Sequence, residues 1–351
     1  MSMKILYAVQ ATGNGHISRA MELMPFLKQY GEVDIFLSGS NSHLQADLPI
    51  KFRSNGLSLF YGNTGGLDYW RMWKELHLKR IFREAQALPV EKYDLVINDF
   101  DSITSLSCKL KKVKSVGFGH QASFQSAYTP RDDKKDIAGE IILKHYATSS
   151  AYIGLHFASY DDFIYPPVIK SEILYADPSD QGHITVYLSH YSDEVVINAL
   201  QKIKDVRFEI FSKKVKSVTS FGNIKLLPIS NTGFTQSMIH SKAVITGAGF
   251  ETPAEALYLG KQLLCLPIRG QYEQRCNAAA LKDYGVTIID KISHNFTEQV
   301  YQWLQVSAAK QLSLSHSTYD IVQQAIELGR SLQPIKKEES LLNEEDLLAL
   351  F

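Results

Sequence analysis

Two glycine-rich turns hold most of the side chains that can take part in chemistry. The later turn, residues 246–249 (TGAG), follows a short apolar run and precedes a helix that carries Glu255. Glycines allow a backbone to approach a bulky group closely, and the free N–H groups of a helix start attract anions. A carboxylate one turn into that helix can accept hydrogen bonds from the hydroxyl groups of a ribose. The pattern therefore predicts a site for a phosphorylated ligand beside Gly247 and Gly249.

A second interpretation gives Glu255 a local structural role only. Thr252 is suited to cap the helix, Pro253 suits its first position, and Glu255 stands where a capping box places its carboxylate. Gly260 is then a natural end of the helix. Local spacing does not separate a ribose ligand from a capping residue, so both interpretations stay open.

The earlier turn, Gly13-Asn14-Gly15, follows the first apolar run of the chain and leads directly into His16. A dinucleotide fingerprint is disfavoured, because Ser18 replaces its third glycine and the second apolar run ends without a carboxylate for a ribose. An imidazole can accept a proton at neutral pH, which makes His16 a candidate general base. The alternative is a histidine that only braces the turn.

Polar side chains also follow two later apolar runs. Asp99 comes after the first of them and His120-Gln121 after the second. Ligands of parallel α/β sheets bind outside the carboxyl ends of the strands, so these side chains are expected at one cleft. Asp99 can orient His16 or act as the base itself. His120 and Gln121 either line the cleft or hold a loop through hydrogen bonds.

The elements that must position these residues alternate between short apolar runs and helical segments. This alternation occurs in both halves of the chain and is typical of doubly wound α/β domains with parallel sheets. A chain of 351 residues suits two such domains better than one. Because the paired prolines Pro166-Pro167 stiffen a connection, the first domain is placed at residues 1–165 and the second at residues 166–316.

Composition excludes several classes of protein. The 37 basic and 37 acidic residues balance, whereas a nucleic-acid-binding protein normally has a basic surplus, so no nucleic-acid partner is expected. Cys108, Cys265 and Cys276 are few, odd in number and not in metal-binding spacing, which is typical of reduced thiols in the cytoplasm. No apolar run approaches the length of a membrane span, so a cytoplasmic protein is expected.

One segment suggests contact with a membrane surface. Trp70, Met72 and Trp73 stand beside several basic residues in a predicted helix that ends near Leu88. Such a stripe can dock peripherally on the inner face of a membrane or bind a lipid acceptor. The same pattern is also typical of the packed face of a helix, and the sequence leaves both interpretations open.

From Gly249 onward the sequence resembles the donor-nucleotide motif of GT-B glycosyltransferases. The closest resemblance is to the MurG-like group, which transfers N-acetylglucosamine from UDP to a lipid-linked acceptor. The family motif reads Gly-Ala-x-Thr-x-x-Glu, then a helix of small residues, Gly-x-Pro, an apolar strand ending in Pro, and Gln-x-x-Asn-Ala. Its counterparts here are Gly249, Phe250, Thr252, Glu255, Gly260, Pro267, Gln274, Asn277 and Ala278. Two departures are Gln262, which replaces the proline of the family's Gly-x-Pro, and Glu273, which replaces one of its paired glutamines.

The resemblance also covers parts of the first half. Gly13 to His16, with Arg19-Ala20 behind them, resemble the Gly-x-Gly-His loop whose histidine lies in the cleft of related enzymes. His120-Gln121 resembles the His-Glu-Gln segment of MurG-like acceptor domains. At Ser189-His190, however, the family has a Gly-Ser-x-Gly loop that contacts the donor diphosphate, and this chain has no glycine there.

The resemblance implies a GT-B fold, in which two Rossmann-like domains with parallel sheets face each other across a cleft. It implies a helix at residues 317–331 that returns to the first domain, ahead of a tail at 332–351. It further implies an inverting, metal-independent glycosyltransferase that has no bound cofactor and takes its sugar from a nucleotide diphosphate, expected to be UDP. The acceptor, whether lipid, glycan or small molecule, is left open.

Each candidate residue receives a role on this basis. His16 and Asp99 are the catalytic candidates. The predicted donor residues are Ser189, His190, Gly247, Gly249, Phe250, Glu251, Thr252, Glu255, Glu273, Gln274 and Asn277, and the predicted acceptor-cleft residues are Gly13, Asn14, Gly15, His120 and Gln121.

Three alternatives are weighed against this assignment. Asp99-Phe100-Asp101 spells the D-x-D motif with which GT-A enzymes hold a metal-bound nucleotide, but the donor motif lies in the other half of the chain. A nucleotide-sugar 2-epimerase shares the GT-B fold and needs acidic and basic groups flanking the sugar. A non-catalytic nucleotide-sugar-binding protein is the third alternative, because of the missing glycines near Ser189.

Overall fold

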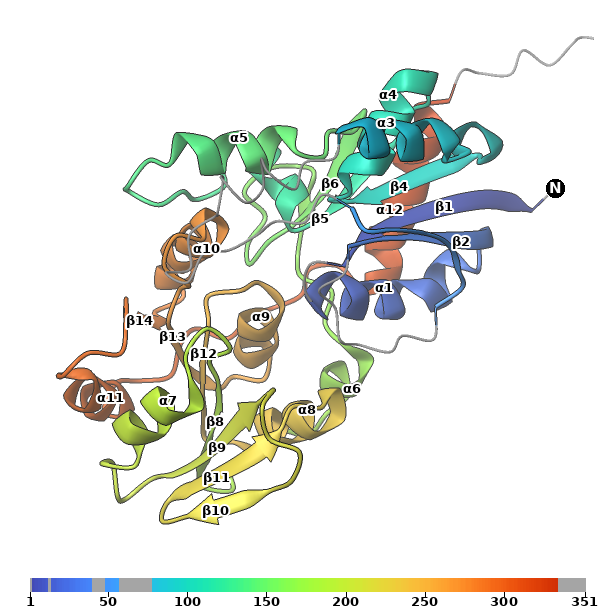
Figure 1. Cartoon of the computed structure of the whole chain (residues 1–351). Helices are drawn as coiled ribbons and strands as arrows, with labels where there is room; N and C mark the ends of the chain where they lie inside the picture. The colour runs from blue at the N-terminus through green and yellow to red at the C-terminus, as the bar shows by residue number, and fades with distance from the viewer. Residues whose placement is uncertain (1, 12–13, 40–47, 57–77, 334–351) are drawn as a thin grey trace, which may run out of the picture.

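The computed structural model describes residues 2–11, 14–39, 48–56 and 78–333, which form two α/β domains (Figure 1). The first domain contains a seven-stranded sheet in the order β3-β2-β1-β4-β5-β6-β7, and every neighbouring pair is parallel. Its strands are β1 (Met3–Gln10), β2 (Gly31–Ser38), β3 (Ile50–Ser54), β4 (Leu95–Asp99), β5 (Val116–Gly119), β6 (Ala151–Leu155) and β7 (Ile164–Tyr165). The strand order reverses between β1 and β4, as in other doubly wound sheets.

Helices cover both faces of this sheet, because its strands carry apolar side chains on both sides. Along β1, Tyr7 and its alternate neighbours belong to the same buried cluster as α1, whereas Leu6 and Ala8 belong to a second cluster with α3 and α4. Buried strands of this kind are typical of parallel sheets. The helices of this domain are α1 (Asn14–Leu27), α3 (Leu78–Ala87), η1 (Val90–Lys92), α4 (Ser102–Lys111), η2 (Gln121–Gln125) and α5 (Ile137–His145).

The second domain repeats the same plan in the order β10-β11-β9-β8-β12-β13-β14. All of its pairs are parallel except β10 with β11 at the edge. Its strands are β8 (His183–Tyr187), β9 (Arg207–Ser212), β10 (Thr219–Phe221), β11 (Ile224–Pro228), β12 (Ala243–Thr246), β13 (Gln262–Cys265) and β14 (Thr287–Ile288). Its helices are α6 (Ser171–Leu174), α7 (Asp193–Leu200), α8 (Asn231–His240), α9 (Glu251–Tyr258), α10 (Tyr272–Lys282) and α11 (Phe296–Leu304). The strand order reverses between β8 and β12.

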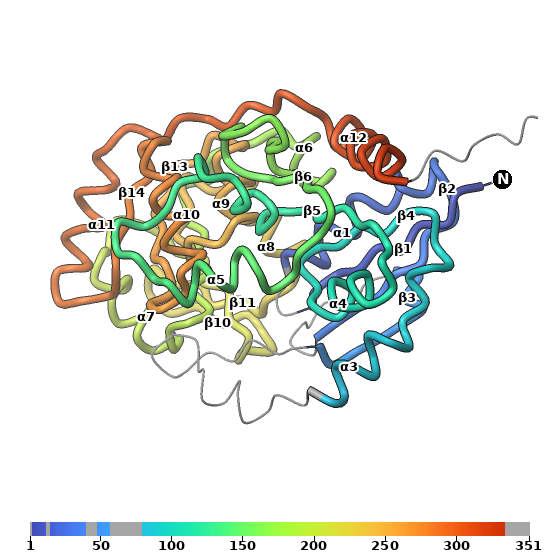
Figure 2. Tube along the Cα trace, turned by 90° about the horizontal axis from the view of Figure 1, so that it is seen from above, coloured from blue at the N-terminus to red at the C-terminus, as the bar shows by residue number. Residues whose placement is uncertain are grey.

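The last helix, α12 (Thr318–Ser331), leaves the second domain and packs on the first (Figures 1 and 2). It contacts α1, β4, β5 and β6. A Cβ added at Gly329 would lie 2.2 Å from Leu95 Cδ1, so the helix approaches β4 as closely as a glycine permits. Ser317 and Asp320 form a capping box at its start. The domain boundary itself stays a prediction.

Two helices begin earlier than the sequence pattern indicates. Helix α9 begins at Glu251, its cap residue Phe250 makes no side-chain capping bond, and Pro253 is its third residue. A proline is tolerated there because the first N–H groups of a helix have no intrahelical partner. The capping-box interpretation of Thr252 and Glu255 is therefore wrong. Helix α1 begins at Asn14, which places His16 inside its first turn and not in the loop.

Other predictions concern parts of the chain that the structure does not describe. Gly13 and the stripe of Trp70, Met72 and Trp73 lie outside the described residues, so the expected membrane contact stays a prediction. In the part of the chain that is described, no helix is both long and apolar enough to cross a membrane.

The two domains share a buried interface. Phe157 of the first domain packs on Phe250 of the second with ring centroids 5.2 Å apart, and both belong to one apolar cluster that extends through the two domains. A smaller cluster joins Phe124 and Leu143 to Tyr272 and Cys276, where α10 lies beside α5 (Figure 1). Separating the domains on this side would expose apolar surface.

Candidate active site

The carboxyl ends of β1 and β4 bring His16 and Asp99 together. This is the point of the first sheet where the strand order reverses, which is where doubly wound sheets bind ligands. Val9 of β1 is in register with Asp99, and His16 follows β1 in the first turn of α1. His16 Nδ1 lies 2.8 Å from Asp99 Oδ1. The structure thus pairs the two candidate catalytic residues, whose catalytic role stays a prediction.

Asp99 is a buried anion. Burial acts to raise the pKa of its carboxyl group, but the charges of Arg19 and His16 and their hydrogen bonds outweigh burial and hold the pKa at about 2. Arg19 donates from Nε to Oδ2 at 3.0 Å and from Nη2 to Oδ1 at 2.9 Å, and the Tyr7 hydroxyl donates to Oδ2 at 3.3 Å. So strong an acid accepts protons poorly at neutral pH, which suits Asp99 to orient His16 and not to act as the base.

The His16 side chain is 12% exposed, so its ring is partly accessible to solvent. An anion beside Nδ1 favours the tautomer with a hydrogen on Nδ1 and a free electron pair on Nε2. Arg19 Nη2 also lies 3.0 Å from Nδ1. A guanidinium can only donate hydrogen bonds. Arg19 Nη2 and His16 Nδ1 therefore both donate to Asp99 and not to each other. Within the described residues no hydrogen bond engages Nε2, which can therefore accept a proton.

The turn that follows Asp99 is held by its own side chains. Phe100 has a positive φ of 58°, which is unusual for a bulky residue and typical of backbone strain near functional sites. Asp101 caps α4 by accepting a hydrogen bond from the Thr104 N–H at 2.6 Å, and the Asn98 side chain accepts one from the Asp101 N–H at 2.8 Å. Asp101, the second acid of the D-x-D sequence, thus caps the start of α4.

In the second domain, the turn after β12 borders open space. A Cβ added at Gly249 would meet no atom within 4 Å, and one at Gly247 would meet Gln274 Oε1 at 3.5 Å. Neither glycine has a positive φ, so the turn does not need glycine for its backbone angles. Partly exposed Thr252 and Glu251 then begin α9, whose free N–H groups carry the positive end of the helix dipole.

Ser189 and His190 form the turn after β8, the neighbour of β12. Ser189 is exposed and His190 is half-buried. Burial lowers the pKa of His190 to about 4, so the ring is neutral at pH 7. Its Nε2 is buried and has no hydrogen-bond partner in the described part of the chain. His190 can therefore offer a hydrogen bond to a ligand but no positive charge.

Glu255 is not on the surface of the α9 turn. The residue is 2% exposed, and its Oε1 lies 3.1 Å from the Nζ atom of Lys170. Burial raises the pKa of its carboxyl group, and the charge of Lys170 opposes this rise. The Glu255 carboxylate is thus paired with Lys170, which lies in the connection between the domains. Its role in binding a ribose stays a prediction, and it requires that Lys170 move away from one carboxylate oxygen.

The other predicted donor residues of α10 contact neighbouring segments. Asn277 is fully buried, donates to the Ala248 carbonyl at 3.1 Å and places Oδ1 2.8 Å from His120 Nε2. Glu273 accepts a hydrogen bond from Gln121 Nε2 at 3.1 Å. The acceptor-side pair His120-Gln121 is thus joined to donor-side residues of the other domain. Gln274 instead accepts a hydrogen bond from the Ile268 N–H at 3.0 Å.

His120 and Phe250 form the centre of this interface. Their rings stack with centroids 4.0 Å apart and planes 8° apart, and both side chains are buried. Burial lowers the pKa of His120, so the stacked ring is neutral at neutral pH. Both side chains pack at the interface between the domains, and the donor role of Phe250 and the cleft role of His120 stay predictions.

The sequence analysis missed Arg19 and Lys170 as members of the site. Arg19 was visible only as part of a family motif, although its spacing of three residues from His16 puts both on one face of a helix. Lys170 gave no signal, because its partner Glu255 is remote in the sequence. Asn14 and Gly15, expected at the cleft, open α1 beside His16.

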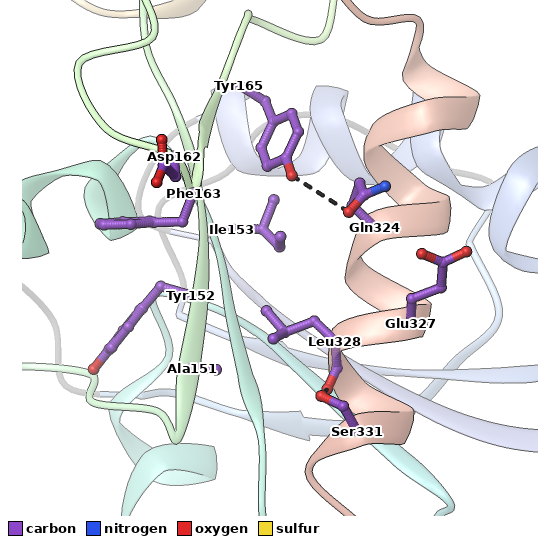
Figure 3. Close-up of a pocket in the computed structure, with 10 residues that line it drawn as sticks. All are labelled: Ala151, Tyr152, Ile153, Asp162, Phe163, Tyr165, Gln324, Glu327, Leu328 and Ser331. Atoms are coloured by element: carbon purple, nitrogen blue, oxygen red, sulfur yellow. Dashed lines mark hydrogen bonds between the residues drawn. The ribbon is translucent and has the colours of Figure 1, made fainter.

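One surface hollow lies away from these strand ends (Figure 3). It has a volume of about 500 Å³ and lies between α12 and the last two strands of the first sheet, β6 and β7. The Tyr165 hydroxyl donates to Gln324 Oε1 at 3.5 Å within it, while Tyr152 and Phe163 lie on the opposite side of the strand from α12. The carboxyl ends of β1 and β4, where His16 and Asp99 meet, do not contribute to it, so it is not the candidate site.

Two Rossmann-like domains with their strand ends at a shared interface define the GT-B class of glycosyltransferases. Residues 3–306 match the family described as Glycosyl transferase family 1, so this chain belongs to that family. The chain is therefore a glycosyltransferase with the GT-B fold expected from its sequence.

Several solved structures share the fold at low sequence identity. UGT89C1 of Arabidopsis thaliana, complexed with UDP, is 15% identical with a TM-score of 0.54, and 99% of each chain is covered. The spinosyn forosaminyltransferase SpnP is 14% identical with a TM-score of 0.57, covering 94% of this chain and 100% of its own. UGT2 of Phytolacca americana, complexed with UDP-2fluoro-glucose and pterostilbene, is 14% identical with a TM-score of 0.57 and full coverage of both chains, 100% each. No curated protein sequence matches this chain.

Proposed function

We propose that this glycosyltransferase moves a sugar from a nucleotide-diphosphate sugar, most simply a UDP-sugar, to a hydroxyl group of an acceptor with inversion at the anomeric carbon. The observation that carries the proposal is the His16–Asp99 pair, with 2.8 Å between Nδ1 and Oδ1. The pair lies where the first strand order reverses and next to the start of α9, which follows the corresponding point of the second sheet.

The donor is assigned to the second domain. The turn from Gly247 to Gly249 borders open space at Gly249, and the first N–H groups of α9 can attract the charge of a diphosphate. Ser189 and neutral His190, on the adjacent strand end, can add hydrogen bonds. UDP complexes of UGT89C1 and a UDP-2fluoro-glucose complex of UGT2 share this fold, which supports uridine as the first nucleotide to test.

The reaction is a single displacement. As the acceptor oxygen forms a bond to the anomeric carbon, His16 Nε2 takes its proton, and the bond between that carbon and the diphosphate oxygen breaks. The nucleoside diphosphate leaves with the electron pair of the broken bond. Asp99 holds the ring and stabilises the imidazolium that forms, and the start of α9 stabilises the charge on the departing diphosphate.

In this reaction no metal ion is needed to stabilise the leaving group. Asp101, the acid that would complete a D-x-D site, is engaged as the cap of α4. The helix start of α9 lies in the donor domain and offers the necessary positive potential. This division of roles supports the metal-independent chemistry implied by the sequence resemblance.

The narrower identity rests on the sequence motif alone. The motif from Gly249 to Ala278 favours MurG-like donor recognition, but several of its residues are occupied at the domain interface. Solved relatives contain quercetin or pterostilbene, which makes a phenolic small molecule the first acceptor to test. A glycan or a lipid remains the next acceptor to try.

The direct experiment combines a binding and a turnover measurement. Calorimetry with UDP measures donor-site binding, and release of UDP from UDP-glucose in the presence of quercetin measures transfer. We expect His16→Ala to bind UDP with the affinity of the wild type and to lose about 10²- to 10⁴-fold in kcat, the usual contribution of a general base. Full turnover by His16→Ala would overturn the assignment.

The same assays separate the two rival functions. Conversion of UDP-N-acetylglucosamine to an epimer without any acceptor would identify a 2-epimerase. Binding of nucleotide sugars with no turnover across a panel of sugars and acceptors, and no effect of His16→Ala, would identify a binding protein.

A further inference from the structure

Arg19 connects the candidate catalytic pair to the other domain. Its guanidinium grips Asp99 with two nitrogens, at 3.0 and 2.9 Å, and its third nitrogen, Nη1, donates to Glu251. Arg19 is 3% exposed and Asp99 is fully buried, so the contacts between these two residues are shielded from water, whereas the Glu251 side chain is 27% exposed. Asp99 belongs to β4 of the first domain, whereas Glu251 is the first residue of α9 in the second.

Glu251 is seated against the same turn that carries His16. A Cβ added at Gly15 would lie 2.6 Å from Glu251 Oε2, so a side chain at position 15 would displace this carboxylate. One oxygen of Glu251 thus faces Arg19 and the other lies over the start of α1. Both oxygens of the Glu251 carboxylate thus have neighbours in the first domain.

The charges of this cluster fit the proposed reaction. Arg19 carries one positive charge and Asp99 and Glu251 carry one negative charge each, so the cluster has an excess negative charge while His16 is neutral. When His16 takes the acceptor proton, the excess is neutralised. Arg19 also shields the departing diphosphate from Glu251, which would otherwise repel it at the start of α9. Removing either carboxylate would leave the buried guanidinium less well neutralised, which costs stability.

We propose that Arg19 is a positioning residue that, docked on Glu251, holds the His16–Asp99 pair in its working geometry only while the two domains are docked. This inference rests on the proposed function and deepens it. In this proposal Glu251 couples the donor domain to the base. The sequence analysis had instead assigned Glu251 as a ligand of the donor. Arg19 touches neither substrate and acts through Asp99.

Two single variants and the double variant test this coupling. Glu251→Gln keeps the size of the side chain and removes its charge, Arg19→Lys keeps the charge and loses the two-nitrogen grip, and the double variant combines them. Glu22→Gln is the matched control, because Glu22 on α1 also contacts the second domain, accepting hydrogen bonds from Ser171 at 2.8 and 3.0 Å, yet has no contact with Asp99.

The expected signature is a loss of kcat without a loss of binding. We expect Glu251→Gln and Arg19→Lys to bind UDP within about twofold of the wild type and to lose about 10- to 100-fold in kcat, as small misplacements of a catalytic group do. The double variant should be no slower than the slower single variant, because both changes break one unit. The control should keep wild-type kcat.

A spectroscopic readout separates this inference from the proposed function. The ring-nitrogen resonances of His16, assigned by their absence in His16→Ala, should shift in Glu251→Gln and stay unchanged in Glu22→Gln, with no substrate present. If no sugar is transferred but the resonances shift, the coupling stands and the proposed function fails. Unchanged resonances, or weaker UDP binding by Glu251→Gln with unchanged kcat, would overturn the coupling.

Discussion

Replacing Asp99 with Asn tests the electrostatics of the site most directly. The substitution preserves shape and removes a buried negative charge that faces Arg19 and His16. Removing one member of a buried ion pair usually costs about 3–5 kcal/mol. Because Glu251 still neutralises Arg19, we expect the lower end of this range, about 3 kcal/mol at pH 7.

The loss should depend on pH in a predictable direction. The pKa of Asp99 is about 2 in the folded protein, against about 4 in an unfolded chain. A depressed pKa stabilises the folded protein above the unfolded value, and this stabilisation disappears as the pH falls from about 4 to about 2. The shift of about two units corresponds to about 2–3 kcal/mol. The wild type and Asp99→Asn should therefore converge in stability over this range.

The assay is chemical denaturation of both proteins at a series of pH values. Other carboxylates titrate equally in the two proteins, so the difference between their free energies of unfolding isolates Asp99. A difference that stays constant between pH 6 and the acid limit of folding would refute the assigned ion pair. In turnover assays we expect Asp99→Asn to lose at least about 10²-fold in kcat, because the His16 tautomer is no longer fixed.

Three further substitutions probe the glycine turns and Glu255. Gly15→Ala should push against Glu251, whose oxygen would lie 2.6 Å from the new Cβ, and lower stability by about 1–3 kcal/mol; unchanged thermal unfolding and kcat would contradict this. Gly249→Ala meets no atom within 4 Å, so stability should change by less than about 0.5 kcal/mol, whereas UDP affinity measured by calorimetry should fall if the diphosphate lies there. If Glu255 binds a ribose after release by Lys170, Glu255→Gln should weaken binding of UDP and leave that of 2′-deoxy-UDP unchanged; equal losses would confine Glu255 to pairing with Lys170.

Local sequence patterns determined the elements and their order. The apolar runs that became β1, β4, β8 and β12 are short and bounded by turns, and the helices between them follow from the same periodicity. Gly260 ends α9 with a φ of 68°, as a helix-terminating glycine should. These features depend on neighbours a few residues away, which a sequence displays directly.

Tertiary structure decided which of the candidate residues meet. His16 and Asp99 are 83 positions apart and meet because β1 lies next to β4. Arg19 and Glu251 are 232 positions apart and meet only because the domains dock. No local pattern reports either contact.

The same docking gave several residues of the motif partners that the motif itself does not show, and their donor roles stay predictions. Asn277 has the residue type of a donor ligand, but the docked first domain supplies His120 as its partner. Glu255 has the spacing of a capping or ribose-binding acid, but helix α9 begins at Glu251 and Lys170 occupies the carboxylate. The sequence alone thus determined the fold class and the position of the two glycine-rich turns, because these arise from local propensity and hydrophobic pattern. The partner of each polar side chain was decided by the packed structure, because a buried charge or amide pairs with whatever group the neighbouring strand or domain brings within reach.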